Sequence, residues 1–464
     1  MAERVYAHFI GIGGAGMSGI ARVLHERGVG VTGSDLKMSR YARALSDAGV
    51  LVSIGHDARN LGDPEVVVVS SAIPETNPEL VEARRIGLPV WQRAKMLAHL
   101  AGGRRTVAIA GTHGKTTTSS MVAMMLSRMG LDPTFLIGGE LNDMGGNARN
   151  GTGGYYVVEA DESDGSFLEL EPWLAVVTNV EADHLDHYGS IEEIERTFGE
   201  FLSRIVPGGV AVVCADDERL MRVVAESGVR ALTYGRSPVA DVRCDDTRAA
   251  SGEFAVTFPD EQSLEARIAI PGRHNVLNAT AALAVADHLG LDVVAAAKTL
   301  AGFSGVRRRF EHVGSVDGVE VVDDYAHHPT EVKATLAAAR TVGSDRVWVI
   351  FQPHRYSRTA ALGRAFGSAF GDADRIVLMD VYGAGEAPVP GVSGKTVLDA
   401  LLEADPTSAV AYFPHRGDVE PYLVSRVRPG DLVITMGAGD VTAIGGELVR
   451  ALDEARAGVE RTCP

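Results

Sequence analysis

The chain has 464 residues, with 44 Lys and Arg against 61 Asp and Glu, which gives a formal net charge of −17. This acidic balance argues against nucleic-acid binding and against docking on anionic membrane surfaces. Three scattered cysteines exclude a disulfide framework or a zinc site, and without a secretory apolar segment or a run of about 18 apolar residues we expect a cytoplasmic protein with no membrane insertion.

The N-terminal region has the pattern of a Rossmann-like domain. A glycine fingerprint, Gly11-x-Gly13-x-x-Gly16, follows the first apolar run and precedes a helix that ends near residue 27. An acidic residue, Asp35, lies about 20 positions beyond the fingerprint. This pattern predicts a site for a pyrophosphate and a ribose without specifying the nucleotide, and a scaffold with an empty crevice stays open as the alternative. The predicted strands are residues 5–10, 29–32 and 66–70.

The central region is organised around the stretch TVAIAGTHGKTTTSS, residues 106–120. A buried strand is expected over residues 107–110, a glycine turn over residues 111–114, and a helix over residues 121–129. Glycines allow backbone N–H groups to approach phosphate oxygens, Lys115 can reach the β- and γ-phosphates, and Thr116 can place its hydroxyl on Mg²⁺. Only two residues separate the glycines, where the standard P-loop has four, so a plain strand-to-helix turn with a capping threonine is the alternative.

Acidic and histidine residues follow the next predicted strands of the central region. Glu159 ends the run YYVVE, and His184 lies in EADHLDHYG after the run LAVVTNV. Because ligands bind at the carboxyl ends of parallel strands, we expect both residues to face the crevice that contains Lys115. The segment 240–270 predicts a small antiparallel excursion, and Asn275 and Asn278 lie on one face of a helix expected over 275–289, where they could cap it or contact a ligand.

The C-terminal region predicts a third doubly wound unit, because strand and helix patterns alternate along it. Arginine and histidine residues gather after its expected strands, which favours recognition of a carboxylate or another anion. With one dinucleotide-type fingerprint and one separate ATP-type cradle, the chain is expected to bind two phosphorylated ligands and to carry out phosphoryl transfer with Mg²⁺. The expected strands are residues 319–325, 346–352, 375–382, 409–413 and 431–436.

Nine segments together resemble one family. They are HFIGIGGAGMSGIA, SSAIPETNPE, AIAGTHGKTTT, VVEADESDGSFL, TNVEADHLDHYGS, PGRHNVLNATAA, GVRRRFE, DDYAHHPTE and FQPHRYSRT. The chain resembles the Mur ligases, ATP-dependent amide-bond ligases of peptidoglycan synthesis, over essentially its whole length. The resemblance implies an α/β protein of three domains: a Rossmann-like UDP-substrate domain (1–101), a P-loop-type ATP-binding domain with a parallel sheet and an antiparallel excursion (102–304), and a Rossmann-like amino-acid domain (305–464).

Within the family, the resemblance is to the branch that joins L-alanine to the carboxylate of UDP-N-acetylmuramate, with ATP as co-substrate and Mg²⁺ as cofactor. It implies an acyl-phosphate intermediate, release of ADP and phosphate, and a place in cell-wall biogenesis, and therefore in cell shape and division. Other branches carry a carbamylated lysine that helps hold a second Mg²⁺, and the segment between Tyr188 and Pro207 contains no lysine. The oligomeric state is open.

The residue patterns and the resemblance together assign the candidate site residues. Arg355 and Arg358 are expected to bind the alanine carboxylate, while Tyr325 and His327 would wall its pocket. The catalytic candidates are Lys115, His184 and Arg309, and the metal candidates are Thr116, Glu159 and His184. The ATP candidates are Gly111, Thr112, His113, Gly114, Lys115, Thr116, Thr117, Asn275, Asn278 and Asp324. The substrate candidates are Gly11, Gly13, Gly14, Ala15, Gly16, Asp35, Ser70, Ser71, Tyr325, His327, Arg355 and Arg358.

Three other functions stay open from the sequence. A recycling ligase of the same family joins a whole tripeptide to the same UDP-sugar. A nicotinamide-dependent UDP-sugar dehydrogenase would explain the segment from Gly11 to Asp35 but leaves the cradle at Lys115 without a role. A non-catalytic UDP-sugar sensor would need no metal pair at Glu159 and His184.

Overall fold

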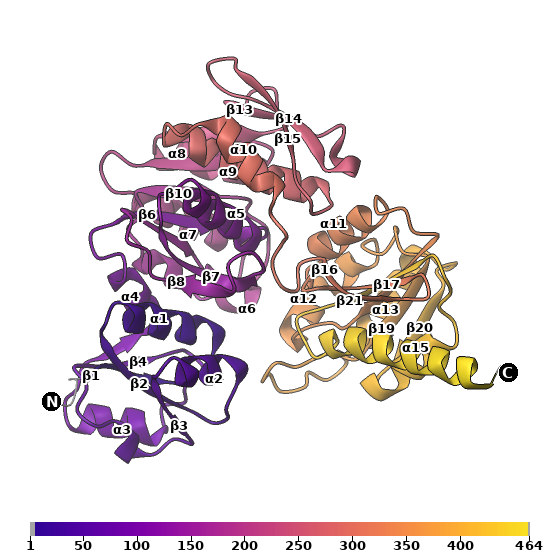
Figure 1. Cartoon of the computed structure of the whole chain (residues 1–464), viewed down its shortest axis with the longest axis horizontal. Helices are drawn as coiled ribbons and strands as arrows, with labels where there is room; N and C mark the ends of the chain where they lie inside the picture. Colours follow the sequence, from indigo (N-terminus) through magenta and orange to yellow (C-terminus); the bar gives the residue numbers. More distant parts are fainter. Residues whose placement is uncertain (1–4, 463–464) are drawn as a thin grey trace. The chain divides into compact units, whose positions relative to one another are not determined.

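A computed structural model describes residues 5–462, and it is an α/β protein built on three sheets (Figure 1). The chain forms two compact units. The first contains the residues through Val180, Glu195–Val242 and Ala281–Leu300, and the second contains Glu181–Ile194, Arg243–Thr280 and the residues from Ala301 onward. Among the described residues, no helix combines the length and the apolar character needed to cross a membrane.

The N-terminal sheet is fully parallel, with the strand order β3-β2-β1-β4-β5. The chain winds away from β1 in one direction and from β4 in the other, so the carboxyl ends of these two strands form the switch point at which open α/β sheets bind ligands. The strands are β1 (Val5–Ile10), β2 (Gly30–Asp35), β3 (Leu51–Ile54), β4 (Val66–Val69) and β5 (Val90–Gln92), and the helices are α1 (Ala15–Glu26), α2 (Arg40–Asp47), α3 (Pro78–Arg85) and α4 (Arg93–His99).

The central strands of the first unit have the order β12-β11-β10-β6-β9-β7-β8, parallel except for the hairpin β7–β8. Continuous apolar runs such as that of β10 are buried on both faces, as parallel strands covered by helices must be. The strands are β6 (Arg105–Ala110), β7 (Thr134–Leu141), β8 (Gly146–Arg149), β9 (Tyr155–Glu159), β10 (Leu174–Val177), β11 (Val210–Cys214) and β12 (Ala231–Gly235), and the helices α5 (Lys115–Arg128) and α8 (Glu218–Ser227) accompany them.

Helix α1 joins the first two sheets into one unit, because it packs on the hairpin β7–β8. The Nδ2 atom of Asn147 in β8 donates to the carbonyl of Ala15, the first residue of α1, at 3.1 Å. A Cβ on Gly19 would lie 3.2 Å from the Ala148 Cβ and 3.4 Å from a Leu136 methyl carbon, so any larger residue would push helix and hairpin slightly apart.

The second unit contains the predicted antiparallel excursion and the C-terminal sheet. Strands β14 (Glu253–Thr257) and β15 (Ser263–Arg267) pair antiparallel with each other, and β13 (Val242–Asp245) pairs antiparallel with β14. The C-terminal sheet has the order β16-β17-β21-β18-β19-β20, with apolar side chains packed on both faces. Its strands are β16 (Glu311–Val316), β17 (Val319–Asp324), β18 (Arg346–Phe351), β19 (Arg375–Met379), β20 (Val410–Phe413) and β21 (Asp431–Met436).

The remaining α-helices accompany the second and third sheets. They are α6 (Leu185–Tyr188), α7 (Ile191–Ser203), α9 (Arg273–His288), α10 (Val293–Ala301), α11 (Pro329–Ala339), α12 (Tyr356–Phe366), α13 (Gly394–Ala404), α14 (Val419–Val424) and α15 (Thr442–Thr462).

The α/β fold with mixed sheets is confirmed, and the differences from the predictions concern element ends and edge strands. Helix α5 begins at Lys115 rather than near residue 121, because the polar residues Thr118 to Ser120 are buried within the helix and do not delay its start. The hairpin β7–β8 and the antiparallel edge strand β16 were not predicted. The domain boundaries at residues 101 and 304 stay predictions.

Candidate active site

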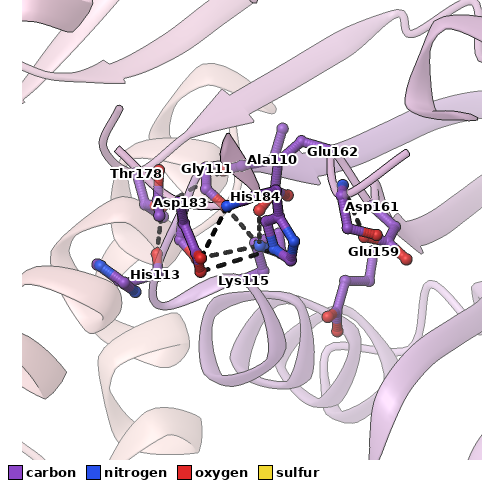
Figure 2. Close-up of polar contacts among 12 residues, drawn as sticks. Ala110, Gly111, His113, Lys115, Glu159, Asp161, Glu162, Thr178, Asp183 and His184 are labelled. Carbon is purple, nitrogen blue, oxygen red and sulfur yellow. Dashed lines mark hydrogen bonds and ion pairs between the residues drawn. The ribbon is translucent and has the colours of Figure 1, made fainter. Parts of the chain in front are cut away.

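The phosphate-type turn connects β6 to α5, and two glycines shape it. Gly111 has φ +129° and Gly114, the residue before the first helical residue, has φ +82°. A Cβ on Gly111 would overlap the side chain of Thr178, so the turn can lie against β10 only with glycine there. The backbone N–H of His113 donates to Asn179 Oδ1 at 2.8 Å, and Thr178 Oγ1 donates to the His113 carbonyl at 2.5 Å (Figure 2).

Lys115 folds back over its own turn. Its Nζ atom donates to the carbonyls of Gly111 at 2.6 Å and Thr112 at 3.1 Å, and it lies 2.7 Å from Oε1 of Glu162 (Figure 2). Burial lowers the pKa of Lys115, but the carboxylates of Glu162, Asp161 and Glu159 more than compensate, so its pKa is raised. The lysine is therefore protonated near pH 7, and its ammonium group lies against the carbonyls of the turn.

Glu162 was not among the predicted site residues, although it lies in the segment EADESDG. Burial raises the pKa of Glu162 to about 7, Lys115 opposes this rise, and Asp161 adds to it. Asp161 in turn lies 3.3 Å from Nη2 of Arg93, the first residue of α4. A row of charged side chains therefore runs from Lys115 through the two carboxylates to Arg93 in α4, and nothing in the local sequence pattern around Arg93 signals this contact.

Thr116 and Glu159, two of the metal candidates, lie side by side. Thr116 Oγ1 donates to Glu159 Oε1 at 3.0 Å, and the other carboxylate oxygen accepts from the backbone N–H of Gly138 at 2.8 Å. A hydroxyl and a carboxylate are the oxygen ligands that Mg²⁺ prefers, so this pair fits the cation. Thr117, the next residue, is buried within α5. His184, the remaining metal candidate, belongs to the second unit.

The glycine turn of the N-terminal domain is braced by the end of β2. The N–H groups of Gly11 and Ile12 donate to the Ser34 carbonyl at 2.8 and 3.0 Å, and the N–H of Gly13 donates to Asp35 Oδ2 at 2.9 Å. Asp35, predicted to contact substrate, therefore also supports the turn. Of the other substrate candidates here, Gly14 caps α1, Ala15 and Gly16 begin it, and Ser70 and Ser71 follow β4 at the same edge of the sheet.

In the second unit, Asp183 is held by Arg358 of α12. The guanidinium makes two bonds to the carboxylate, at 3.1 and 3.2 Å, and both side chains are buried. Despite burial, which raises it, the pKa of Asp183 is held well below its usual range, chiefly by the charge of Arg358. His184 follows with φ +53°, a left-handed conformation that is strained for a residue with a Cβ.

Arg355 differs from Arg358 in its surroundings. Its nearest anionic partner is Asp186 at 3.5 Å, and both side chains are about 40% exposed (38% and 44%). A hollow lies between the segment before and within α6 and the start of α12. Its lining includes Asp183, His184, Asp186, Arg355, Ser357 and Arg358. The two arginines thus occur together, as predicted, but only Arg355 keeps a loosely held guanidinium.

Aromatic rings form a row at the carboxyl ends of β17, β18 and β19. Tyr325 packs edge-on against His327, with 5.2 Å between the ring centroids, and His327 packs edge-on against His354, with 5.8 Å between them. His354 stacks on Tyr382 with a centroid distance of 6.0 Å. Burial lowers the pKa of His327 to about 3 and that of His354 to about 4, although Glu331 opposes the shift at His327. Both imidazoles are therefore neutral near pH 7 and can form a compact wall.

Four further candidates lie in the second unit. Nη1 of Arg309 lies 3.3 Å from Glu331 Oε1, and its guanidinium lies over the Tyr325 ring. Asp324 accepts the backbone N–H groups of Phe310 and Ala326, at 2.8 and 2.7 Å, and burial raises its pKa to about 6. Near the start of α9, Asn278 Nδ2 donates to Asn275 Oδ1 at 3.4 Å, and Asn275 Nδ2 donates to the Pro271 carbonyl at 2.7 Å.

Comparison with known proteins identifies relatives over nearly the whole chain. The family models described as Mur ligase family, catalytic domain, Mur ligase middle domain, and Mur ligase, glutamate ligase domain match residues 6–105, 109–286 and 308–439. A UDP-N-acetylmuramate–L-alanine ligase of Rubrobacter xylanophilus is 51% identical over 448 residues, with 96% of this chain and 99% of the relative covered. The corresponding ligase of Pelotomaculum thermopropionicum is 48% identical over 459 residues, with 98% and 99% covered.

Solved structures of Mur-type ligases also align with nearly the whole chain. The UDP-N-acetylmuramate–alanine ligase of Thermotoga maritima aligns with a TM-score of 0.81 and 30% identity, with 97% of this chain and 100% of that one covered. A murein peptide ligase of Psychrobacter arcticus aligns with a TM-score of 0.72 and 27% identity, with 97% and 98% covered.

Proposed function

This chain belongs to the Mur ligase family, and we propose that it joins L-alanine to the carboxylate of UDP-N-acetylmuramate with consumption of ATP. The observation that carries the specificity is the identity of 48% and 51% to alanine-adding ligases over nearly the full chain. The murein peptide ligase, a candidate alternative, is a more distant relative at 27% identity. We place the enzyme in the cytoplasm, where ATP and nucleotide sugars are made.

The reaction needs an activated carboxylate, because a carboxylate is a poor electrophile. In the proposed mechanism, an oxygen of the UDP-sugar carboxylate attacks the γ-phosphorus of ATP, ADP leaves, and an acyl phosphate forms. The neutral amine of L-alanine then attacks the acyl carbon, and the tetrahedral intermediate loses phosphate to give the amide. Two anions meet in the first step, so positive charge must be fixed where they approach.

Lys115 is the cation best placed to meet the transferred phosphoryl group. All three of its ammonium protons are directed to protein atoms, on Gly111, Thr112 and Glu162. A phosphate oxygen must therefore replace at least one of these contacts when ATP binds. The proposed metal residues are Thr116, Glu159 and His184, and Mg²⁺ bound there would neutralise charge on the β- and γ-phosphates.

The alanine site is proposed at the start of α12, with different tasks for its two arginines. Arg355 has a long contact to a half-exposed partner, so its guanidinium is available for the carboxylate of L-alanine. Arg358 already makes a buried two-point contact to Asp183, and its remaining Nη1 donates to His354 at 3.1 Å. We assign Arg358 chiefly to holding the segment that carries His184.

The test is phosphate release by the purified chain with UDP-N-acetylmuramate, ATP and Mg²⁺, with L-alanine in one arm and the murein tripeptide in the other. Release with L-alanine, and a product heavier by one alanyl residue, supports the proposal. Release with the tripeptide alone would assign the chain to the recycling ligases. Reduction of a nicotinamide cofactor without phosphate release would contradict ligase function altogether.

A further inference from the structure

Glu79 is a fully buried carboxylate in the N-terminal domain, at the second position of α3. Within the described part of the chain, its ionic partners are histidines and include no lysine or arginine. Its two oxygens instead accept four hydrogen bonds, which use all the acceptor sites of a carboxylate. The donors are His8 Nε2 at 3.0 Å and Ser34 Oγ at 2.6 Å on Oε2, and Asp57 N at 3.0 Å and Asn60 Nδ2 at 2.8 Å on Oε1.

These donors bring separate chain segments of the N-terminal domain together. His8 lies in β1, Ser34 near the end of β2, and Asn60 in the short 3-10 helix η1 (Ala58–Asn60). Burial raises the pKa of Glu79, but the hydrogen bonds of His8, Ser34 and Asn60 outweigh it, so the pKa lies well below its usual value. The carboxylate is therefore ionised near pH 7 and accepts charge-assisted hydrogen bonds from all four donors.

Ser34 connects this carboxylate to the glycine turn. Its hydroxyl donates to Glu79, while its backbone carbonyl accepts the N–H groups of Gly11 and Ile12. The next residue, Asp35, accepts the N–H of Gly13. The turn is therefore attached to the end of β2 at three points, and the end of β2 is attached to Glu79.

A buried ionised network of this kind needs a reason, because an apolar cluster of similar volume often stabilises a fold equally well. Its connection, through Ser34, to the turn that is proposed to bind the substrate pyrophosphate supplies one. We infer that Glu79 is a positioning residue for UDP-N-acetylmuramate, which sets the position of the Gly11–Gly14 turn through Ser34. This inference rests on the proposed function, since it concerns how that same substrate is bound.

Two variants test the inference. Glu79→Gln removes the charge at nearly constant shape, and Ser34→Ala removes only the hydroxyl that links carboxylate and turn, which makes it the milder change if Glu79→Gln folds poorly. In both, we expect the KM for UDP-N-acetylmuramate to rise about tenfold, the scale of one lost hydrogen bond to a charged group. The KM for ATP, the KM for L-alanine and kcat at saturating UDP-sugar should stay within about twofold, because Glu79 contacts none of the residues proposed to bind those ligands.

The matched control is Asp431→Asn, which neutralises another buried carboxylate, bonded to Arg346 and Trp348 in the C-terminal sheet. We expect it to lower Tm without changing the KM for the UDP-sugar. If Glu79→Gln and Ser34→Ala behave as this control does, with a lower Tm and an unchanged KM, Glu79 is merely structural and the inference is overturned. Calorimetry of the wild type tests the proposed function separately from the role of Glu79. If the wild-type protein does not bind UDP-N-acetylmuramate at all, the proposed function itself is contradicted.

Discussion

The Nζ atom of Lys115 lies 2.7 Å from Oε1 of Glu162, in surroundings that leave 15% and 4% of the two side chains exposed. The pair, together with two carbonyl contacts of the same nitrogen, keeps the lysine at the phosphate-type turn before any ligand binds. ATP therefore meets a cation that is already at the turn, and a phosphate oxygen binds it by displacing at least one of these three contacts.

Replacement of Lys115 by alanine should remove the charge that stabilises the transferring phosphoryl group. We expect kcat to fall by roughly 10²–10³-fold, the range seen when one preorganised donor is lost from an active site. Calorimetry should show unchanged binding of UDP-N-acetylmuramate. Lys298→Ala, at an exposed position of α10, is the control and should keep wild-type turnover. Near-normal kcat for the Lys115 variant would remove the ATP assignment from this turn.

Replacement of Glu159 by glutamine should weaken the proposed magnesium site, because an amide oxygen carries no full charge. A Mg²⁺ titration of activity should shift to higher concentration by about tenfold or more, within the 10–100-fold range seen for partners of metal ligands. A direct Mn²⁺ binding measurement with ADP should show the same shift without turnover. Glu169→Gln, at an exposed position, is the control. Superimposable titrations for wild type and Glu159→Gln would exclude this carboxylate as a ligand.

Substitutions of Arg355, the N-cap residue of α12, and of Arg358, within α12, should have different effects on alanine binding and on stability. Arg355→Ala should raise the KM for L-alanine by tenfold or more, since the amino-acid carboxylate loses its guanidinium partner, and leave Tm nearly unchanged. Arg358→Ala should instead destabilise the fold by about 3–5 kcal/mol, because it leaves Asp183 buried without its partner. Denaturant unfolding and alanine titrations of both variants provide the measurement. A selective KM effect for Arg358→Ala at unchanged stability would move the carboxylate site to Arg358.

Acid should destabilise the protein through His327. Because burial lowers the folded-state pKa of His327 to about 3, its neutral form is favoured in the folded chain, and the unfolded chain takes up a proton first as pH falls below about 6.5. This stability is fully present above pH 6.5 and is lost progressively towards pH 3, by roughly 2 kcal/mol at pH 5.

The variant His327→Gln should therefore lose less stability than the wild type between pH 7.5 and pH 5, measured by denaturant unfolding without substrates. His415→Gln, which changes an exposed histidine, should follow the wild type. Parallel stability curves for wild type and His327→Gln would show that the imidazole is not held neutral.

Local sequence patterns predicted the parts of the site that lie close together in the chain. The turn from Gly111 to Gly114, with Lys115 and Thr116 after it, is one continuous segment, and its geometry follows from glycine conformations and helix initiation. The contact of Thr116 with Glu159 could also be predicted, because the parallel strands β6 and β9 are neighbours whose carboxyl ends meet.

Contacts between distant segments could not be predicted in the same way. Asp183 and Arg358 are 175 positions apart, and Glu79 meets His8 across 71 positions. An acidic residue near a helix start, such as Glu79, has the pattern of an ordinary capping residue. Its role depends on which strands lie beneath it, and that depends on the order of the whole sheet.

The central claim is that the carboxylate of UDP-N-acetylmuramate is activated as an acyl phosphate before L-alanine attacks. It is tested most directly with UDP-N-acetylmuramate carrying ¹⁸O in both carboxylate oxygens, incubated with ATP, Mg²⁺ and L-alanine. Mass spectrometry of the released phosphate should show one ¹⁸O atom transferred per amide bond formed, and the product amide should retain the other. Phosphate without ¹⁸O, alongside normal amide formation, would contradict the acyl-phosphate route.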